Sequence, residues 1–173
     1  MSVVTGPDNL REEKISLLIR RYEKDLLRTC CVYLRDKDMA QDAVQETFFK
    51  AYKALDSFRG ESTEKTWLYS IAFNVCRDMR RSAWFRYVDM RVTLDHLPDP
   101  VEPASEASIA LMQEIMRLPR KLMETVWLYY YEDMNMKEIG DMLGVAATTV
   151  GYRLDKARAL LRSRLKGGES DEK

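Results

Sequence analysis

The sequence predicts an all-α protein in which a flexible acidic linker joins two small helical domains. Apolar residues recur at three- and four-residue spacing along most of the chain, which is the period of an amphipathic helix. Glycine and proline, which interrupt helices, are scarce at 7 and 5 of 173 residues. Three of the prolines, Pro98, Pro100 and Pro103, lie close together and mark a break between two helical segments.

This break sets the expected domain boundaries: a first domain at residues 10–85, an acidic linker at 86–105 and a second domain at 106–166. In the first domain the apolar periodicity predicts a loop at 56–63 and helices near residues 11–35, 38–55 and 64–84. In the second domain it predicts helices near residues 106–117, 119–132, 135–143 and 148–165.

The composition indicates a soluble folded protein, with 46% hydrophobic and 32% charged residues. Residues 1–14 lack the apolar run of a secretory signal, so we expect the chain to act in the cytoplasm. His96 is the single histidine and no cysteine pair has CxxC spacing, so we expect no metal site, no cofactor and no catalytic set. Buried apolar packing is the favoured interpretation of Cys30, Cys31 and Cys76.

The charges sum to zero, with 28 basic and 28 acidic residues, but they are not evenly distributed. Arginines dominate residues 77–86, lysines and arginines dominate residues 151–166, and acids dominate residues 91–110. Local basic patches attract phosphate whatever the net charge is. Two basic segments that flank an acidic one therefore favour nucleic acid as a partner.

The helix expected at 38–55 carries an unusual exposed stripe. On a helical wheel the core side holds Ala40, Val44, Thr47, Phe48, Ala51 and Leu55. The opposite side holds Asp42, Gln45, Glu46, Phe49 and Lys53. A solvated face with one stray aromatic is one interpretation. A docking surface with an apolar anchor among hydrogen-bond acceptors is the other.

The helix that contains residues 66–81 places Ser70, Phe73, Asn74, Arg77 and Arg81 on one side of its wheel. Asparagine and arginine can bond base edges and phosphates, and an exposed phenylalanine can stack an unpaired base. These residues suit single-stranded or opening DNA. An ordinary surface helix with basic residues near its C-terminus remains the alternative.

Residues 136–165 have the layout of a helix-turn-helix. Ile139 and Leu143 mark the first helix, Gly144 and Val145 the turn, and the second helix buries Val150, Leu154, Ala157 and Leu161. On its other side the second helix projects Thr149, Tyr152, Arg153 and Lys156 toward a major groove. Arg153 can bond guanine, Thr149 and Tyr152 can bond phosphates or base edges, and the side chains that can neutralise phosphates are Lys156, Arg158 and Arg162. A helical hairpin without DNA contact is the alternative.

Three segments in this order resemble the extracytoplasmic-function (ECF) group of bacterial RNA polymerase sigma factors. They are MAQDAVQETFFKAY (39–52), TWLYSIAFNVCRDMRR (66–81), and LPRKLMETVWLYYYEDMNMKEIGDMLGV with TVGYRLDKARALL. The resemblance covers roughly residues 12–166. It implies a protein that binds core RNA polymerase, directs promoter-specific initiation and is controlled by an anti-sigma factor.

The resemblance also implies site residues. Polymerase contact is implied for Asp42, Gln45, Glu46 and Phe49. Recognition and melting of the minus-ten element is implied for the 56–65 loop and the helix after it, with candidates Arg59, Lys65, Phe73, Asn74, Arg77, Arg80 and Arg81. Reading of the minus-thirty-five duplex is implied for Thr148, Thr149, Tyr152, Arg153, Lys156 and Arg158.

The chain departs from the group's pattern where the second helix of the helix-turn-helix begins. Ala146 stands at the usual position of a capping serine, and alanine cannot cap, so Thr148 is expected to start the helix instead. Gly151 and Tyr152 replace a common lysine–serine pair. These changes bear on promoter preference.

A helix-turn-helix repressor or activator that acts without polymerase is the main rival interpretation. It accounts for residues 136–165 but leaves the 42–49 stripe and the 66–81 helix without a role. An anti-sigma-like decoy is a weaker rival, because the arginine-bearing and recognition helices are intact. No ATP-binding GxxxxGK[ST] loop is present, so melting is expected to rely on capture of unstacked bases.

Overall fold

A computed structural model of the 173-residue chain describes residues 7–81 and 105–168. In both ranges all regular secondary structure is helical, which confirms the predicted fold class. The chain divides into two compact units, Met1–Pro98 and Asp99–Lys173. The predicted linker at 86–105 lies outside the described residues except for Ser105.

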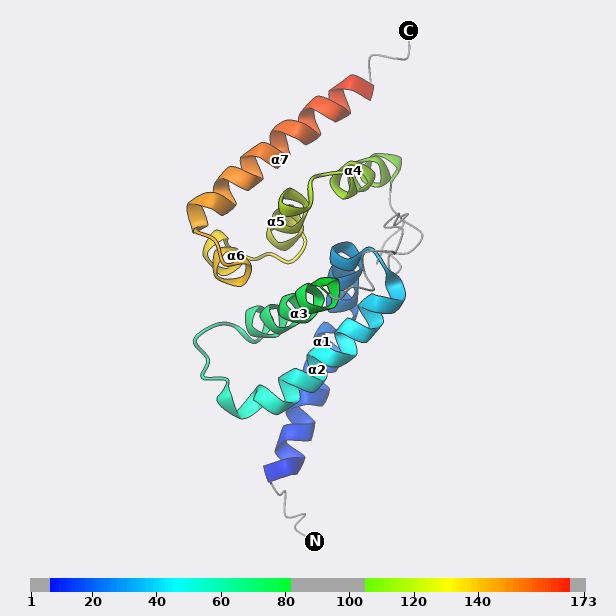
Figure 1. Cartoon of the computed structure of the whole chain (residues 1–173). Helices are drawn as coiled ribbons and strands as arrows, with labels where there is room; N and C mark the ends of the chain where they lie inside the picture. Colours follow the sequence, from blue (N-terminus) through cyan, green and yellow to red (C-terminus); the bar gives the residue numbers. More distant parts are fainter. Residues whose placement is uncertain (1–6, 82–104, 169–173) are drawn as a thin grey trace. The chain divides into compact units, whose positions relative to one another are not determined.

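The first unit is a bundle of three helices, α1 (Pro7–Leu34), α2 (Lys37–Ala54) and α3 (Glu64–Arg81), with a short 3-10 helix η1 (Leu55–Ser57) after α2 (Figure 1). Each helix contacts the other two. The chain leaves α1 through Arg35, whose φ of 57° is in the left-handed region. Asp36 then caps α2, because its Oδ1 accepts a hydrogen bond of 2.8 Å from the amide of Met39.

Apolar and aromatic side chains fill the interior of this bundle. Leu26, Leu34, Leu68 and Tyr69 are among its fully buried members. Burial of each large apolar side chain contributes about 1.5–3 kcal/mol, so packing and not helix propensity holds the three helices together. The polar stretch between η1 and α3 therefore sits on a fixed scaffold.

The second unit holds α4 (Glu106–Met116), α5 (Arg120–Tyr130), α6 (Met136–Leu143) and α7 (Ala147–Gly168). Ser105 caps α4 through a 3.2 Å hydrogen bond from the amide of Ser108. The long helix α7 contacts all three others (Figure 1). Buried Trp127, Met123, Ile139 and Leu154 join α5, α6 and α7 in one core.

The predicted helix boundaries agree with the structure to within a few residues, and two starting points are informative. Pro119, expected in the first turn of a helix, occupies the N-cap position of α5 with φ −51°. The recognition helix α7 begins at Ala147, so the prediction that Thr148 starts it is wrong. The carbonyl of Ala146 already accepts hydrogen bonds from the amides of Thr149 and Val150, at 2.9 and 3.2 Å.

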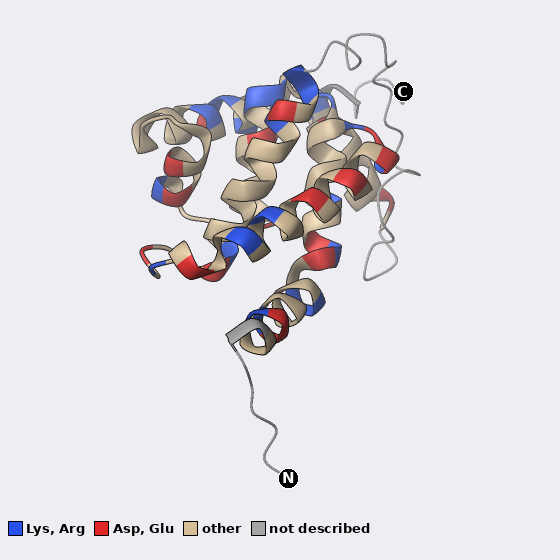
Figure 2. Ribbon diagram, turned by 60° about the horizontal axis from the view of Figure 1, so that its bottom comes forward, with Lys and Arg blue, Asp and Glu red and all other residues tan. Residues whose placement is uncertain are grey.

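No helix in the described ranges has both the length and the apolar character that crossing a membrane requires. Basic and acidic residues occur together on most of the helices (Figure 2), in keeping with a net charge of zero. Charge is therefore balanced over the chain as a whole, and a binding face must be found from individual side chains.

Candidate polymerase- and promoter-binding surfaces

The predicted stripe on α2 is exposed. We call Asp42, Gln45, Glu46 and Phe49 the α2 stripe. Asp42 and Gln45 are exposed, Glu46 is half-buried, and Phe49 keeps 53% of its surface in contact with solvent. The opposite side of α2 buries Ala40, Ala43, Val44, Thr47, Phe48 and Ala51.

Local contacts hold the side chains of the α2 stripe. The ammonium of Lys53 lies 4.0 Å from the centroid of the Phe49 ring, and Lys50 pairs with Glu46 at 3.7 Å. A large apolar ring displayed among acceptor groups is suited to a partner that carries an apolar pocket and basic side chains. Its role in binding polymerase stays a prediction.

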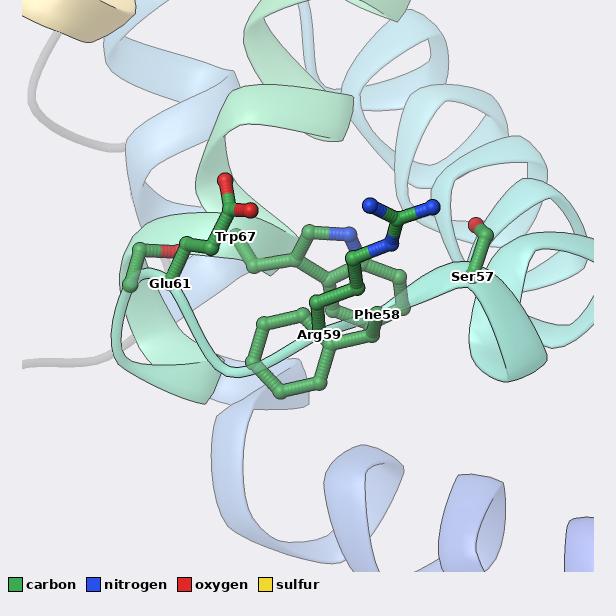
Figure 3. A pocket seen from close by; sticks show the side chains of 6 residues that line it. Ser57, Phe58, Arg59, Glu61 and Trp67 are labelled. Atoms are coloured by element: carbon green, nitrogen blue, oxygen red, sulfur yellow. The ribbon is translucent and has the colours of Figure 1, made fainter.

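A pocket of about 330 Å³ opens between η1 and the start of α3. It is lined by Ser57, Phe58, Arg59, Glu61, Ser62 and Trp67. The Phe58 and Trp67 rings lie with centroids 4.8 Å apart and planes tilted by 34°. Figure 3 shows the two rings beside each other, with the side chains of Arg59 and Glu61 next to them.

This pocket combines the groups that hold a planar heterocycle: aromatic faces for stacking, a guanidinium, a carboxylate and two hydroxyls. Arg59 was expected near DNA from the resemblance. Neither Phe58 nor Trp67 was among the site residues predicted from the sequence. Their signal in the sequence is an aromatic next to Arg59 in an otherwise polar loop.

Only some of the polar residues predicted to bind DNA lie on one face of α3. Asn74 and Arg81 are exposed and Arg77 is half-buried, and their spacing of three and four residues puts them on one face. Lys65 lies at the other end of α3, with its ammonium 5.5 Å from the Tyr69 ring centroid. Arg80 is half-buried and its guanidinium carbon lies 6.0 Å from the Tyr33 ring centroid.

The prediction that Phe73 is an exposed stacking surface is wrong. Phe73 is 3% exposed and packs edge-on against Tyr33, with ring centroids 5.0 Å apart and planes at 75°. The physical reason is that α3 packs against both α1 and α2, so its buried arc is wider than the single stripe assumed from the wheel. Phe73 is a core residue.

The helix-turn-helix of the second unit is formed by α6 and α7. Asn135 and Glu138 make a capping box at the start of α6, and Gly144 ends that helix in the left-handed region at φ 68°. The amide of Val145 donates to the carbonyl of Gly140 at 2.9 Å. Glycine is needed at position 140, because a Cβ there would lie only 2.7 Å from the carbonyl oxygen of Val145 in the turn.

The predicted DNA-facing residues of α7 differ in exposure. Tyr152 is 65% exposed, Thr148 and Lys156 are also exposed, and Thr149 and Arg153 are half-buried. The ammonium of Lys156 lies 6.0 Å from the Tyr152 ring centroid. As predicted, Val150, Leu154 and Ala157 are buried on the other side, while Leu161 is half-buried.

Arg158 is held by neighbours within its own unit. Its Nε donates to the hydroxyl of Tyr130 at 2.8 Å, and its guanidinium bonds Asp155 at 2.9 Å. The hydrogen bond to Tyr130 is the main cause that raises the pKa of Arg158 above its ordinary value. Arg158 thereby fixes α7 against α5, whatever contact it makes with phosphate.

Two family profiles match the chain: Sigma-70 region 2 over residues 18–86, and Sigma-70, region 4 over residues 108–161. The RNA polymerase sigma-H factor of Pseudomonas aeruginosa is 31% identical over 156 residues, which span 82% of this chain and 81% of that protein. The ECF RNA polymerase sigma factor SigW of Bacillus subtilis is 30% identical over 159 residues, which span 84% and 85%.

Two solved structures share the fold. CnrH, in complex with the cytosolic domain of CnrY, matches with a TM-score of 0.67 and 24% identity over 90% of each chain. The sigma factor RpoE of Bartonella quintana, in complex with the anti-sigma factor NepR, matches with a TM-score of 0.63 and 24% identity over 90% of this chain and 96% of that one. Both sigma-70 regions are present in order, and two sigma factors, the ECF factor SigW among them, are matched over most of their length, so the chain belongs to the ECF group of bacterial RNA polymerase sigma factors.

Proposed function

We propose how the described surfaces divide the work of this sigma factor, which binds core RNA polymerase and directs promoter-specific transcription initiation. The α2 stripe docks on core polymerase. The pocket between η1 and α3, together with Asn74, Arg77 and Arg81, engages unpaired bases of the minus-ten element. The α6–α7 helix-turn-helix reads the minus-thirty-five element as duplex.

The observation that carries this division is the aromatic pocket lined by Phe58 and Trp67. A base that leaves the duplex loses its stacking, and an aromatic surface replaces part of it, at about 1–3 kcal/mol per base. The pocket's rings, hydroxyls and charged groups can both stack a base and bond its edge. Melting then follows from capture of unpaired bases and does not require nucleotide hydrolysis, so we propose a binding subunit and not an enzyme.

Each DNA-binding surface is small, and this explains why a polymerase-docking stripe is needed. The polar face of α3 offers three side chains and the start of α7 only a few more. When polymerase holds both units at the separation of the two promoter elements, the second contact becomes intramolecular and gains effective concentration. The isolated chain is therefore expected to bind promoter DNA weakly. We propose that it acts in the cytoplasm, together with the polymerase.

Control by an anti-sigma factor is part of this proposal. The related RpoE of Bartonella quintana was solved in complex with the anti-sigma factor NepR, and CnrH in complex with the cytosolic domain of CnrY. A protein that covers the α2 stripe would compete directly with polymerase. Phe49 is the natural anchor for either partner because it is exposed at 53%.

The test is in vitro transcription with core polymerase on a library of promoter fragments, with and without the protein. We expect new start sites that share two spaced upstream elements. The Phe49→Ala variant is expected to lose core binding at least tenfold, while Leu17→Ala, which truncates a 63%-exposed leucine on α1, serves as the matched control. Absence of specific starts, together with tight footprinting of duplex DNA by the protein alone, would support an operator-binding regulator instead.

A second arm tests the pocket. Phe58→Ala is expected to reduce permanganate reactivity of thymines in the open complex, while the closed complex still forms. Leu17→Ala, on α1 and outside the lining of the pocket, removes an exposed apolar side chain and is the control. Equal open-complex formation by Phe58→Ala and wild type would contradict base capture in this pocket.

A further inference from the structure

The first six residues of the recognition helix carry no charged side chain. Residues 147–152 read Ala-Thr-Thr-Val-Gly-Tyr, and Arg153 is the first cation of α7. A helix-turn-helix inserts its second helix into the major groove with the N-terminal residues at the base edges. In this protein the segment that enters deepest is therefore made of methyl groups, hydroxyls and one aromatic ring.

Gly151 leaves an open place on this segment. A Cβ at that position would meet a single heavy atom within 4 Å, the Sδ of Met136, at 3.6 Å. Met136 begins α6 and is 43% exposed as a residue, and its thioether lies beside the glycine. Tyr152 follows directly and is 65% exposed. Gly151 thus presents no side chain of its own, and the Met136 thioether is its neighbour from α6.

The base chemistry that fits this segment is specific. Guanine is read by arginine or lysine and adenine by asparagine or glutamine, and residues 147–152 contain none of these. Thymine presents a C5 methyl group in the major groove, which is read by apolar contact with alanine, the threonine methyl or an aromatic ring. The hydroxyls of this segment can bond several base edges, whereas its apolar groups match one base-specific feature, the methyl group of thymine.

We infer that the start of α7 reads thymine methyl groups in the minus-thirty-five element, with the exposed Tyr152 and Met136 as the specificity-determining side chains. Lys156, one turn further along, binds phosphate and positions the helix without choosing the base. This inference rests on the proposed function, because it assumes that α7 reads the minus-thirty-five duplex.

The experiment removes only the methyl group. Once the promoter is known from transcription with core polymerase, each thymine of the minus-thirty-five element is replaced by deoxyuridine, one position at a time. Holoenzyme binding and initiation are then compared on the two templates. The expected loss is about fourfold for each thymine whose methyl group is buried against the protein. Deoxyuridine in the spacer is the template control.

Three variants separate a direct contact from a structural effect. Tyr152→Phe keeps the ring and is expected to keep the sensitivity to deoxyuridine. Tyr152→Ser removes the ring and is expected to initiate equally on thymine and deoxyuridine templates for at least one position. Arg162→Ala is expected to weaken initiation to the same extent on both templates, since this exposed side chain lies ten residues beyond Tyr152 and its loss alters phosphate binding alone.

The outcomes distinguish the inference from the function beneath it. If the protein directs specific starts that need the minus-thirty-five element, but every deoxyuridine template is used as well as its parent, methyl reading is wrong and the sigma assignment of the surfaces stands. A minus-thirty-five element without thymine has the same consequence. If core polymerase gains no specific starts, the proposed function itself fails.

Discussion

The guanidinium of Arg11 lies 3.3 Å from the carboxylate of Asp56 and joins the start of α1 to the segment that precedes the aromatic pocket. The same guanidinium donates a 3.2 Å hydrogen bond to the backbone carbonyl oxygen of Tyr52 and lies 5.1 Å from the centroid of the Tyr52 ring. One side chain thus ties α1 to the last turn of α2 and to η1. Phe58, the first ring of the pocket, follows η1 directly.

Loss of this tie is expected to act on both stability and promoter opening. Arg11→Ala removes a charge-assisted hydrogen bond and a half-exposed ion pair, which together contribute about 1–2 kcal/mol to the free energy of unfolding. Because η1 is less firmly held, the open complex should also form more slowly, while binding to core polymerase is unchanged. Urea unfolding and permanganate footprinting measure the two effects.

Lys50→Ala is the control for Arg11→Ala, since Lys50 pairs with Glu46 on the surface of a single helix. Its effect on unfolding should stay within about 0.5 kcal/mol. Equal stability of the two variants, or an unchanged rate of promoter opening in Arg11→Ala, would show that Arg11 does not hold the loop in place.

Two glycines of the helix-turn-helix are expected to respond oppositely to alanine. In Gly140→Ala the new methyl group would lie 2.7 Å from the backbone oxygen of Val145, so the turn must shift. The free energy of unfolding of the second unit should then fall by about 1–3 kcal/mol. In Gly151→Ala the methyl group meets only the flexible end of Met136, at 3.6 Å. The gain in helix propensity should then stabilise α7 by about 0.5–1 kcal/mol.

Hydrogen exchange of the amides in α6 and α7 measures this pair, because it reports on the second unit separately from the first. Protection should fall in Gly140→Ala and rise in Gly151→Ala. A loss of protection in both variants would mean that Gly151 is required by the backbone and not merely tolerated.

The sequence predicted the helices and the helix-turn-helix well because those features depend on local periodicity and on one glycine at the turn. Gly144 adopts the left-handed conformation for which glycine is suited, as expected from its place after Leu143. Phe73 was misplaced because a wheel cannot show that a helix packs against two neighbours. The Phe58–Trp67 pocket was missed because residues nine positions apart, one in a loop, meet only in the folded chain.

Helix α7 lacks a side-chain N-cap, and a substitution that supplies one should stabilise the second unit. Ala146 occupies the position before the first residue of α7, and its methyl group cannot accept a hydrogen bond from the first amides of the helix. Ala146→Ser should supply that acceptor and raise the free energy of unfolding of the second unit by about 1 kcal/mol. Ala147→Ser, one residue inside the helix, is the control and should give no such gain. Thermal unfolding compares them, and an equal response of both variants would exclude capping as the cause.

The buried thiol of Cys31 makes a prediction about alkaline pH. Burial raises the pKa of Cys31 from 9.0 to about 11, although the nearby Lys37 partly opposes this. The thiol is 1% exposed and lies in the bundle of the first unit. Between pH 9 and 11 the unfolded chain has therefore lost this proton while the folded chain still holds it.

The sign of the effect follows from that difference in bound protons. The stability that the protein owes to the buried, protonated thiol of Cys31 is complete below pH 9. It is lost as the pH rises toward 11, because the thiol ionises less readily in the folded state than in the unfolded chain. Cys31→Ala lacks the titrating group but keeps every other one. The stability of the wild type relative to Cys31→Ala, from urea midpoints at pH 7.5, 9 and 10.5, should accordingly shrink as the pH rises. A constant difference across that range would mean that Cys31 ionises as easily in the folded protein as in the unfolded chain.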